Sequence, residues 1–385
     1  MIKYIAFYDV NSNEEENRNV PPAAKTKIDY IISTLCSFEK KIEIISPAVT
    51  TSKNTFKGKK ISLSEKCDLK LFLTFGKNKL VFTKVGTLIT KILFMFYLFI
   101  NVKKDDDVIV YHSLYYMRFI KILRKIKRFN LILEIEEIYS DVLNDEVRKK
   151  KEQAFFKCAN SYIFPTKLLD AEINVEHRPF VIVHGTYQVE KDRRCNVFED
   201  NMQGITDKMV HCVYAGTFDP RKGGALAAVS ATAFLPSQYW IHVLGFGSDE
   251  EIRNMKKHIL EIDEKSKAHV SYDGLLSGEE YIRFIQSCDI GLSTQNPDAA
   301  FNATSFPSKI LSYLSNGLRV VSIRIPAIED SDVGDKLFYY DEQTPKQIAD
   351  AILSVDMAQA YDSRSDIVDL SNKFQNELML MMKDY

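Results

Sequence analysis

The sequence predicts an α/β protein built from two Rossmann-like domains that face a cleft. Short apolar segments typical of strands alternate with helix-like segments along the whole chain, a pattern that indicates parallel sheets. The length of 385 residues exceeds what one hydrophobic core usually supports. A polar, charged stretch at Tyr187–Asp207 interrupts the alternation. We therefore expect an amino-terminal domain over 1–190, a linker over 191–207, a second domain over 208–360 and a carboxyl-terminal helix over 361–385.

The first half of the chain contains the expected elements of the amino-terminal domain. Met1–Val10 is too short an apolar segment for a secretory signal, so we interpret Ile2–Tyr8 as the first strand. Pro21 and Pro22 favour a helix start. The later strands of this half are expected at Lys41–Ser46, Leu69–Phe75, Val108–Tyr111, Leu131–Ile135, Ala159–Phe164 and Pro179–Val183, and the helices at Ala23–Phe38 and Ser113–Arg128.

The second half repeats the alternation, and its helix starts are well marked. Residues that favour N-caps and first turns occur at Ser248–Glu250, Ser277–Glu280 and Thr344–Pro345. The strands of this half are expected at His211–Phe218, Tyr239–Leu244, Ala268–Ser271, Ile290–Ser293, Arg319–Ile323 and Leu337–Tyr339, and further helices at Gly223–Leu235 and Ser363–Lys383.

One apolar segment, Val85–Val102, bears on whether the protein meets a membrane. It contains an unbroken apolar run, Ile92–Ile100, that follows Lys91. A spanning helix needs about 20 apolar residues, which this run does not reach. Two interpretations stay open: a buried core helix, or a helix that dips into a membrane face. The basic residues of the segment Arg118–Arg128 are expected to form the solvent-exposed face of an amphipathic helix. The alternative is that this helix docks on anionic lipid.

The composition narrows the class of protein. The formal net charge of -1 argues against nucleic acid as the main partner. The six cysteines are scattered and form no C-x-x-C pair, which favours reduced thiols in the cytoplasm. No carboxylate pair with metal-ligand spacing accompanies the basic motifs described next, so we expect neither a metal nor a cofactor.

Positively charged residues lie where two helices of the second domain are expected to begin. Lys309 lies in the first turn after Phe306-Pro307, and Arg221 and Lys222 directly precede the helix Gly223–Leu235. The positive end of a helix dipole disfavours cations unless an anion binds there. Two such helix starts in one domain indicate a site for a diphosphate and hence a nucleotide-linked substrate.

Five motifs follow one another in the second half of the chain: AGTFDPRKG, LGFGS, YDGLLSGEEY, CDIGL and SFPSKILSYLSNGLRVVS. In this order they resemble the carboxyl-terminal domain of GT-B-fold glycosyltransferases, with family 4 as the nearest group. The resemblance covers about the carboxyl-terminal half. It implies GT-B architecture and retaining transfer of a sugar from a nucleotide diphosphate sugar.

The resemblance also implies roles for individual residues. The family's diphosphate-binding Lys matches Lys222, and its partner Arg matches Thr217, which carries no charge. The two family carboxylates that contact the donor sugar and the ribose match Thr304 and Ser312, so both are missing here. The expected donor-binding residues are Gly216, Thr217, Arg221, Lys222, Thr304, Ser305, Phe306, Ser308, Lys309 and Ser312.

The acceptor side is expected in the first domain. Glu136 and Glu137 follow the strand Leu131–Ile135, where their carboxylates would face the cleft and orient an acceptor hydroxyl or take its proton. His112, directly after the strand Val108–Tyr111, is a second catalytic candidate.

These features predict a glycosyltransferase that moves a sugar, UDP-linked for example, to a glycan or lipid-linked glycan hydroxyl in surface polysaccharide synthesis. We expect it in the cytoplasm or at the inner face of the membrane. Two alternatives stay open: a GT-B sugar-nucleotide epimerase and a non-catalytic partner of a glycosyltransferase. A dehydrogenase is disfavoured because no G-x-G-x-x-G follows the first strand.

Overall fold

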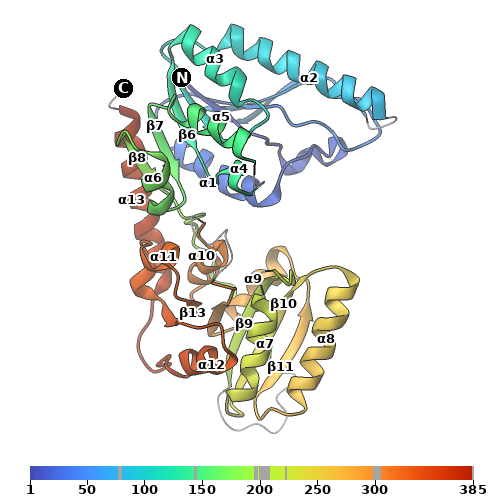
Figure 1. The fold of residues 1–385 in the computed structure, drawn as a ribbon, viewed down its shortest axis with the longest axis vertical. Helices are drawn as coiled ribbons and strands as arrows, with labels where there is room; N and C mark the ends of the chain where they lie inside the picture. The colour runs from blue at the N-terminus through green and yellow to red at the C-terminus, as the bar shows by residue number, and fades with distance from the viewer. Residues whose placement is uncertain are drawn as a thin grey trace. The chain divides into compact units, whose positions relative to one another are not determined.

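The computed structural model describes residues 1–76, 80–142, 145–194, 198, 209–221, 223–297 and 305–383, and the chain divides into two compact units (Figure 1). Unit 1 comprises Met1–Val183 and Phe374–Tyr385, and unit 2 comprises His184–Lys373. Unit 2 thus begins before the stretch 191–207 in which the sequence predicts a linker, and the end of the last helix returns to unit 1.

Unit 1 is built on an eight-stranded sheet in the order β3-β4-β2-β1-β5-β6-β7-β8. All neighbouring strands are parallel except β3, which pairs antiparallel with β4 at one edge. The central strands are apolar runs buried on both faces, as parallel strands between two helix layers must be. The strands are β1 (Ile2–Ile5), β2 (Ile42–Ser46), β3 (Lys59–Ser64), β4 (Cys67–Leu71), β5 (Asp107–Tyr111), β6 (Asn130–Glu134), β7 (Ser161–Phe164) and β8 (Phe180–Ile182).

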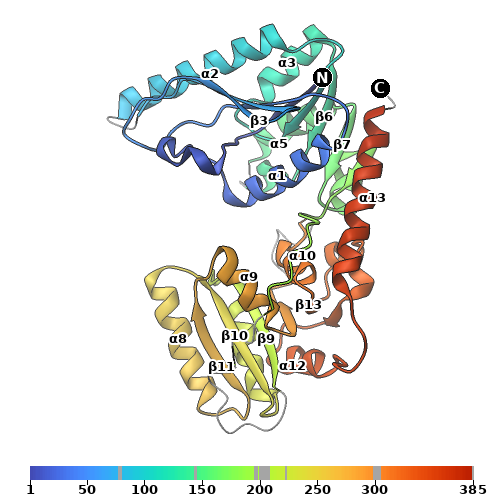
Figure 2. The same ribbon diagram turned by 180° about the vertical axis from the view of Figure 1, so that it is seen from behind.

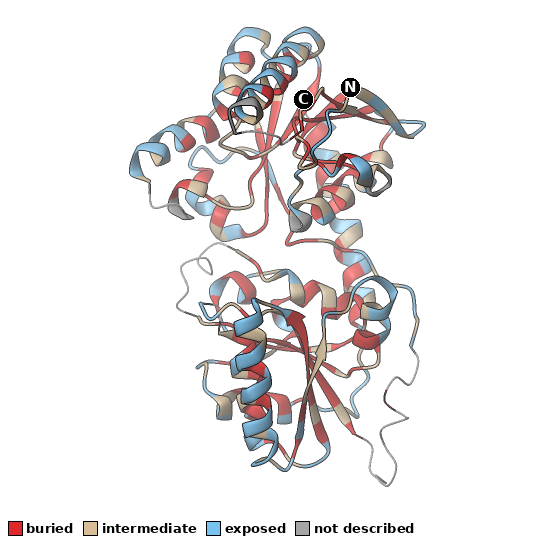
Figure 3. Cartoon of the chain, turned by 90° about the vertical axis from the view of Figure 1, so that its right-hand side faces the viewer, coloured by how far each residue is buried: buried red, intermediate tan, exposed pale blue. Residues whose placement is uncertain are grey.

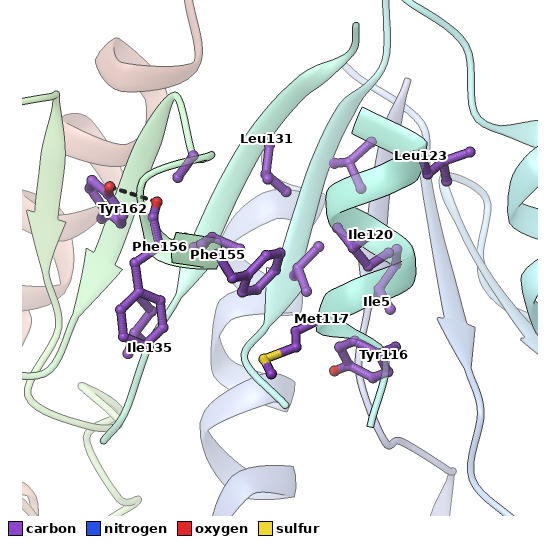
Figure 4. Close-up of a cluster of buried hydrophobic side chains, with 14 of the residues drawn as sticks. Ile5, Tyr116, Met117, Ile120, Leu123, Leu131, Ile135, Phe155, Phe156 and Tyr162 are labelled. Carbon is purple, nitrogen blue, oxygen red and sulfur yellow. Dashed lines mark hydrogen bonds between the residues drawn. The ribbon is translucent and has the colours of Figure 1, made fainter. Parts of the chain in front are cut away.

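Helices cover this sheet. They are α1 (Pro22–Cys36), α2 (Leu80–Asn101), α3 (Met117–Lys127), α4 (Tyr139–Val142), α5 (Glu146–Phe156) and α6 (Lys167–Ile173). α3 turns Met117, Ile120 and Leu123 toward the sheet, where they join Phe155 and Phe156 of α5 in one apolar cluster (Figure 4). The spacing of three and four residues places one helix stripe in this core and leaves the other face of α3 outside.

The helix α2 forms the apolar segment for which the sequence left two interpretations open, a buried core helix or a helix that dips into a membrane face. Its segment Thr83–Asn101 is long and apolar enough to cross a membrane, with a mean hydropathy of 1.5, yet it packs along unit 1 through Phe94 and Leu98. Only 22% of that segment is buried. Figure 3 shows exposed residues on the helices around the mostly buried strands. The α2 face turned away from the sheet is therefore apolar and exposed.

The last helix, α13 (Ser363–Lys383), returns to unit 1. The ring of Phe374 stacks on Tyr30 of α1 with centroids 5.8 Å apart, and Gln375 donates a hydrogen bond to Ser37. Phe374 is 1% exposed. Figures 1 and 2 show the carboxyl-terminal part of α13 beside β7.

Unit 2 holds a six-stranded parallel sheet in the order β11-β10-β9-β12-β13-β14. Its strands are β9 (Val210–Thr217), β10 (Tyr239–Phe246), β11 (His269–Gly274), β12 (Ile290–Ser293), β13 (Arg319–Ile323) and β14 (Phe338–Tyr340). Its helices are α7 (Gly224–Ala231), α8 (Asp249–Asp263), α9 (Gly278–Gln286), α10 (Ser308–Ser315), α11 (Pro326–Glu329) and α12 (Pro345–Leu353). The strand order reverses between β9 and β12, which is where open parallel sheets bind ligands.

Candidate active site

A cavity of about 490 Å³ lies in unit 2 at the reversal of the strand order. It is bounded by the carboxyl end of β9, the residues after β12 and the first turn of α10. Its lining residues are Tyr214, Ala215, Gly216, Thr217, Tyr281, Thr294, Gln295, Ser305, Phe306, Pro307, Ser308, Lys309 and Ser312. Seven of the ten residues that the sequence predicts for donor binding are among them: Gly216, Thr217, Ser305, Phe306, Ser308, Lys309 and Ser312.

The start of α10 supplies the positive charge of this cavity. The helix begins after Pro307 without a side-chain cap, so no side chain of its N-cap residue bonds the amides of its first turn. Lys309 lies in that turn, with its Nζ 4.0 Å from the centroid of the Tyr214 ring. A helix N-terminus and an ammonium group at one place favour binding of an anion, phosphate above all.

Glycine at position 216 leaves room for this arrangement. A Cβ at Gly216 would lie 3.2 Å from Lys309 Nζ and 3.1 Å from the Tyr214 hydroxyl. In the neighbouring strand Gly245 has a φ of +153°, and a Cβ there would lie 1.9 Å from the Gly216 carbonyl oxygen. The backbone of β9 can thus lie close to a ligand on one side, and on its other side it lies close to the backbone of β10.

Buried phenols hold the cavity walls. Tyr313 of α10 accepts a hydrogen bond from the Ala215 N–H at 2.8 Å, which fixes the end of β9 against the helix. Tyr281 lies 3.4 Å, oxygen to oxygen, from the hydroxyl of Ser312. Burial raises the pKa of both Tyr214 and Tyr281, so these hydroxyls stay protonated and can donate. Tyr214, Tyr281, Thr294 and Gln295 are cavity residues that sequence reasoning missed.

Arg221 does not join the cavity. Its side chain is 87% exposed and pairs with Asp219, with Nη2 2.7 Å from a carboxylate oxygen. The helix α7 that follows starts at Gly224, after Gly223 in a left-handed conformation with φ of +61°. The structure therefore gives Arg221 a local ion pair rather than a place in the predicted clamp. Lys222 and Thr304 lie outside the described residues.

The structure places His112 in the interior of unit 1. It is 1% exposed, and its Nε2 lies 2.6 Å from Oε1 of Glu152. Glu152 also accepts hydrogen bonds from the N–H groups of Tyr139 and Ser140 at the start of α4. Burial alone would raise the pKa of Glu152, but these bonds and His112 hold it below its usual range. The pair thus anchors α4 to α5, a structural role.

Three carboxylates gather at the carboxyl end of β6. Glu134 ends the strand, and Glu136 and Glu137 follow in the loop, both partly exposed. The Nζ of Lys27 lies 2.6 Å from Oε1 of Glu136 and also donates to the Val183 carbonyl. Burial, with Glu136 and Glu152 nearby, raises the pKa of Glu137.

Glu134 is fully buried beside Tyr4. This contact of Glu134 was not predicted from the sequence. The Tyr4 hydroxyl donates to its Oε2, while its Oε1 has no hydrogen-bond partner among the described residues. Burial and the neighbouring charge of Glu136 raise the pKa of Glu134 to about 8. A proton on this carboxyl at neutral pH relieves repulsion against Glu136. In the described part of the chain no three His, Cys, Asp or Glu side chains gather as metal ligands.

Comparisons with known proteins identify the fold. No family model and no curated protein matches the sequence. Solved structures do match: OtsA, a trehalose-6-phosphate synthase (9% identity, TM-score 0.68), aligns over 100% of this chain and 98% of its own. A trehalose-6-phosphate enzyme from E. coli bound with UDP-2-fluoro glucose (11%, TM-score 0.67) covers 100% and 98%.

A third similar structure is an α,α-trehalose-phosphate synthase (UDP-forming) from Burkholderia xenovorans in complex with glucose-6-phosphate. It has 10% identity and a TM-score of 0.64, over 100% of this chain and 99% of that one. At such identities the likeness bears on the fold rather than on individual side chains. The chain has the GT-B fold, two Rossmann-like units each built on its own sheet.

Proposed function

We propose that this protein is a glycosyltransferase that uses a nucleotide diphosphate sugar. The observation that carries the proposal is the cavity at the carboxyl end of β9, at which α10 places its N-terminus and Lys309. The GT-B fold supports it, as does the binding of UDP-2-fluoro glucose by a similar structure. UDP is accordingly the proposed donor nucleotide.

The chemistry follows from the charges. Cleavage of the bond between the anomeric carbon and the diphosphate oxygen leaves negative charge on the departing nucleotide. Lys309 and the α10 dipole would stabilise that charge in a site already shaped before the reaction. We propose that these groups serve in place of a metal ion, with Lys222 and Thr304 contributing from outside the described residues. Retention of anomeric configuration is carried over from the resemblance to family 4.

Glu136 and Glu137 are the proposed acceptor-side residues. Both stand at the carboxyl end of a parallel strand and are partly exposed, whereas His112 is buried. Each carboxylate can accept a hydrogen bond from an acceptor hydroxyl. The proposed acceptor is a glycan or lipid-linked glycan in surface polysaccharide synthesis at the inner face of the membrane. The apolar face of α2 supports that location.

The first test is calorimetric titration of the protein with UDP, GDP, ADP and dTDP, each with and without a metal chelator. We expect one nucleotide to bind selectively and independently of metal. Absence of binding by all four would contradict the donor site and favour a non-catalytic partner protein, a reading that Ser312 in place of a carboxylate also favours.

A second test measures transfer of the sugar to different acceptors. Incubation of the preferred nucleotide sugar with glucose-6-phosphate, with a soluble glycan and with a lipid-linked glycan should yield product with one acceptor class. Conversion of the donor to its epimer without any acceptor would instead show a sugar-nucleotide epimerase.

A further inference from the structure

A second hollow, of about 460 Å³, lies on unit 1 and concentrates positive charge. It is formed by the middle and end of α3, the turn after α5 and Arg178, two residues before β8. Its lining residues are Lys121, Arg124, Lys125, Lys157, Cys158, Ala159, Asn160 and Arg178, and no acidic residue is among those described. Because α3 leads into β6, the hollow lies at the amino ends of β6, β7 and β8. Glu136 lies beyond the opposite end of β6, so this hollow is distinct from the proposed acceptor site.

The cations of the hollow bond mostly to uncharged protein groups. Lys121 donates to the Ala154 carbonyl at 3.0 Å, and Arg124 donates to the Asn160 side chain at 2.8 Å. The Nε of Arg124 is buried without a hydrogen-bond partner among the described residues. Burial lowers the pKa of Arg124, and the nearby Arg178 adds to this effect. Arg178 itself pairs with the exposed Glu176. Such a concentration of positive charge is favourable when an anion fills the hollow.

Apolar surface adjoins the hollow. Lys127 of α3 holds its Nζ 4.9 Å from the centroid of the Phe99 ring of α2, so the ends of the two helices meet. Figures 1 and 2 show α2 and α3 beside one another on the outside of unit 1. Large apolar side chains at least 37% exposed stand along both helices: Val85, Leu88, Ile89, Ile92, Leu93, Phe96, Phe99, Ile100, Ile122 and Ile126.

The charged residues of α2 and α3 are all positive. The segments of α2 and α3 contain seven Lys and Arg residues and no Asp or Glu: Lys84, Lys91, Arg118, Lys121, Arg124, Lys125 and Lys127. A helix with an apolar face and flanking cations is typical of attachment to the surface of an anionic membrane.

We propose that the exposed face of α2 and α3 docks on an anionic phospholipid bilayer and that the basic hollow takes a phosphate headgroup. A second copy of the chain fits less well, because a twofold pairing would bring the same cations face to face. Free phosphate would fill the hollow but leave the apolar face uncovered. The proposal deepens the proposed membrane location, and it holds whether or not the chain transfers sugar.

Vesicle binding by the full chain tests the headgroup site. The protein is sedimented with vesicles of phosphatidylcholine alone or with one-third phosphatidylglycerol. A lysine near an anionic surface contributes about fivefold to binding, so the pair Lys125→Gln and Lys157→Gln should lower binding roughly 25-fold. Both lysines are exposed, so the fold should persist. The matched control pair is Lys265→Gln and Lys267→Gln in unit 2, also exposed, and should bind like wild type.

A second pair of variants tests the apolar face. Leu88→Ser with Phe96→Ser should also weaken binding more than tenfold, because each variant removes several apolar carbon atoms that would be buried in lipid. The control is Leu260→Ser with Leu275→Ser, which change side chains 64% and 66% exposed in unit 2.

Three results would overturn the proposal. The first is equal binding to both vesicle types. The second is binding of inorganic phosphate or glycerol phosphate, sensitive to the Lys125 and Lys157 changes, without binding to vesicles. The third is a lipid-free dimer that the Leu88 and Phe96 changes dissociate. Loss of nucleotide binding or sugar transfer with vesicle binding intact would refute the proposed function alone.

Discussion

At the scale of single residues, the donor cavity carries a positive charge, whereas the residues at the end of β6 are carboxylic acids. Lys309 is the cation among the described residues that line the cavity in unit 2, whereas Glu134, Glu136 and Glu137 gather in unit 1. Only Lys27 lies within ion-pair distance of this carboxylate group in the described part of the chain. The two sites therefore suit opposite tasks, the binding of a leaving diphosphate and the positioning of a hydroxyl.

We expect Glu136→Gln to lower kcat/KM for the acceptor about 100-fold or more, the lower end of what a general base or orienting carboxylate contributes. Affinity for the donor nucleotide should not change, because the donor cavity lies in unit 2. Steady-state kinetics and titration measure the two quantities. Asp29→Asn, which removes another charge from the same unit, serves as the control. Unchanged acceptor kinetics would assign the role to Glu137 or to neither.

Because the pKa of Glu134 is raised, we expect the free energy of unfolding of unit 1 to depend on pH. Its pKa in the folded protein is about 8, above the ordinary 4.5. The folded state therefore binds the proton more tightly, and the stabilisation is complete below about pH 4.5 and is lost as the pH rises to about 8. The loss approaches about 1.4 kcal/mol per pH unit for one proton. Urea unfolding of unit 1 at pH 5 and pH 8 should show a smaller difference in Glu134→Gln than in wild type. An identical difference in both proteins would contradict this.

The sequence predicted the cavity residues that lie within one continuous motif. Lys309 could be placed because a proline-started helix with an early lysine breaks the usual charge preference, and Ser305, Phe306, Ser308 and Ser312 because their motif resembles that of GT-B glycosyltransferases. Tyr281 and Gln295 could not be placed, because they come from other segments and only the folded sheet brings them to the cavity. Arg221 does not line the cavity, and Asp219, two residues earlier, accepts hydrogen bonds from its guanidinium, a pairing that the motif alone did not reveal.

At the scale of elements, the two ends of α10 have different roles. Its N-terminus faces the cavity, and its carboxyl end closes with a Schellman motif at Gly317. The Leu318 N–H donates to the Tyr313 carbonyl and the Gly317 N–H donates to the Leu314 carbonyl. Gly317 has a φ of +88°, and β13 begins two residues later.

We expect Gly317→Ala to lower the free energy of unfolding of unit 2 by about 1–2 kcal/mol, the cost of the left-handed conformation for a residue with a Cβ. Gly317→Asn should cost less, since asparagine tolerates this conformation. Thermal unfolding measures both variants. Equal stability of the alanine variant and wild type would show that the turn rearranges without strain.

Strands with a continuous apolar run were predictable from the sequence, whereas two elements rich in lysine were missed. Ile290–Ser293 and Arg319–Ile323 match β12 and β13 as expected. β3 was missed because it is an edge strand with alternately exposed residues in a lysine-rich stretch. α5 was missed because three consecutive lysines, Lys149 to Lys151, obscure its buried stripe. For α2 the choice between a core helix and a membrane-facing helix stayed open, because composition does not tell which side of a helix a sheet covers.

At the scale of the whole molecule, the chain leaves unit 1 at Val183 and returns to it at Phe374. The sequence predicted a final helix at Ser363–Lys383 and the structure has it, but its return to unit 1 depends on contacts between distant segments. The two-unit α/β fold itself was predictable from the alternation of strands and helices, and the similar structures confirm it.

We expect Phe374→Ala to destabilise unit 1 by about 3–5 kcal/mol, the usual cost of removing a buried phenyl ring. Differential scanning calorimetry should show the transition of unit 1 at a lower temperature, with the nucleotide affinity of unit 2 preserved. Val368→Ala on the same helix changes a side chain that is 46% exposed and should have little effect. A shift of equal size in both variants would contradict the anchoring role of Phe374.

The central claim is that Lys309 and the start of α10 bind the diphosphate of a nucleotide sugar. Its most direct test is calorimetric titration of wild type and Lys309→Ala with UDP and with uridine. The variant should bind UDP about 1.5–3 kcal/mol more weakly, the range for hydrogen bonds to a charged group, and should bind uridine like wild type. The exposed Lys267→Ala should match wild type with both ligands. Equal affinity of wild type and Lys309→Ala for UDP would contradict the claim.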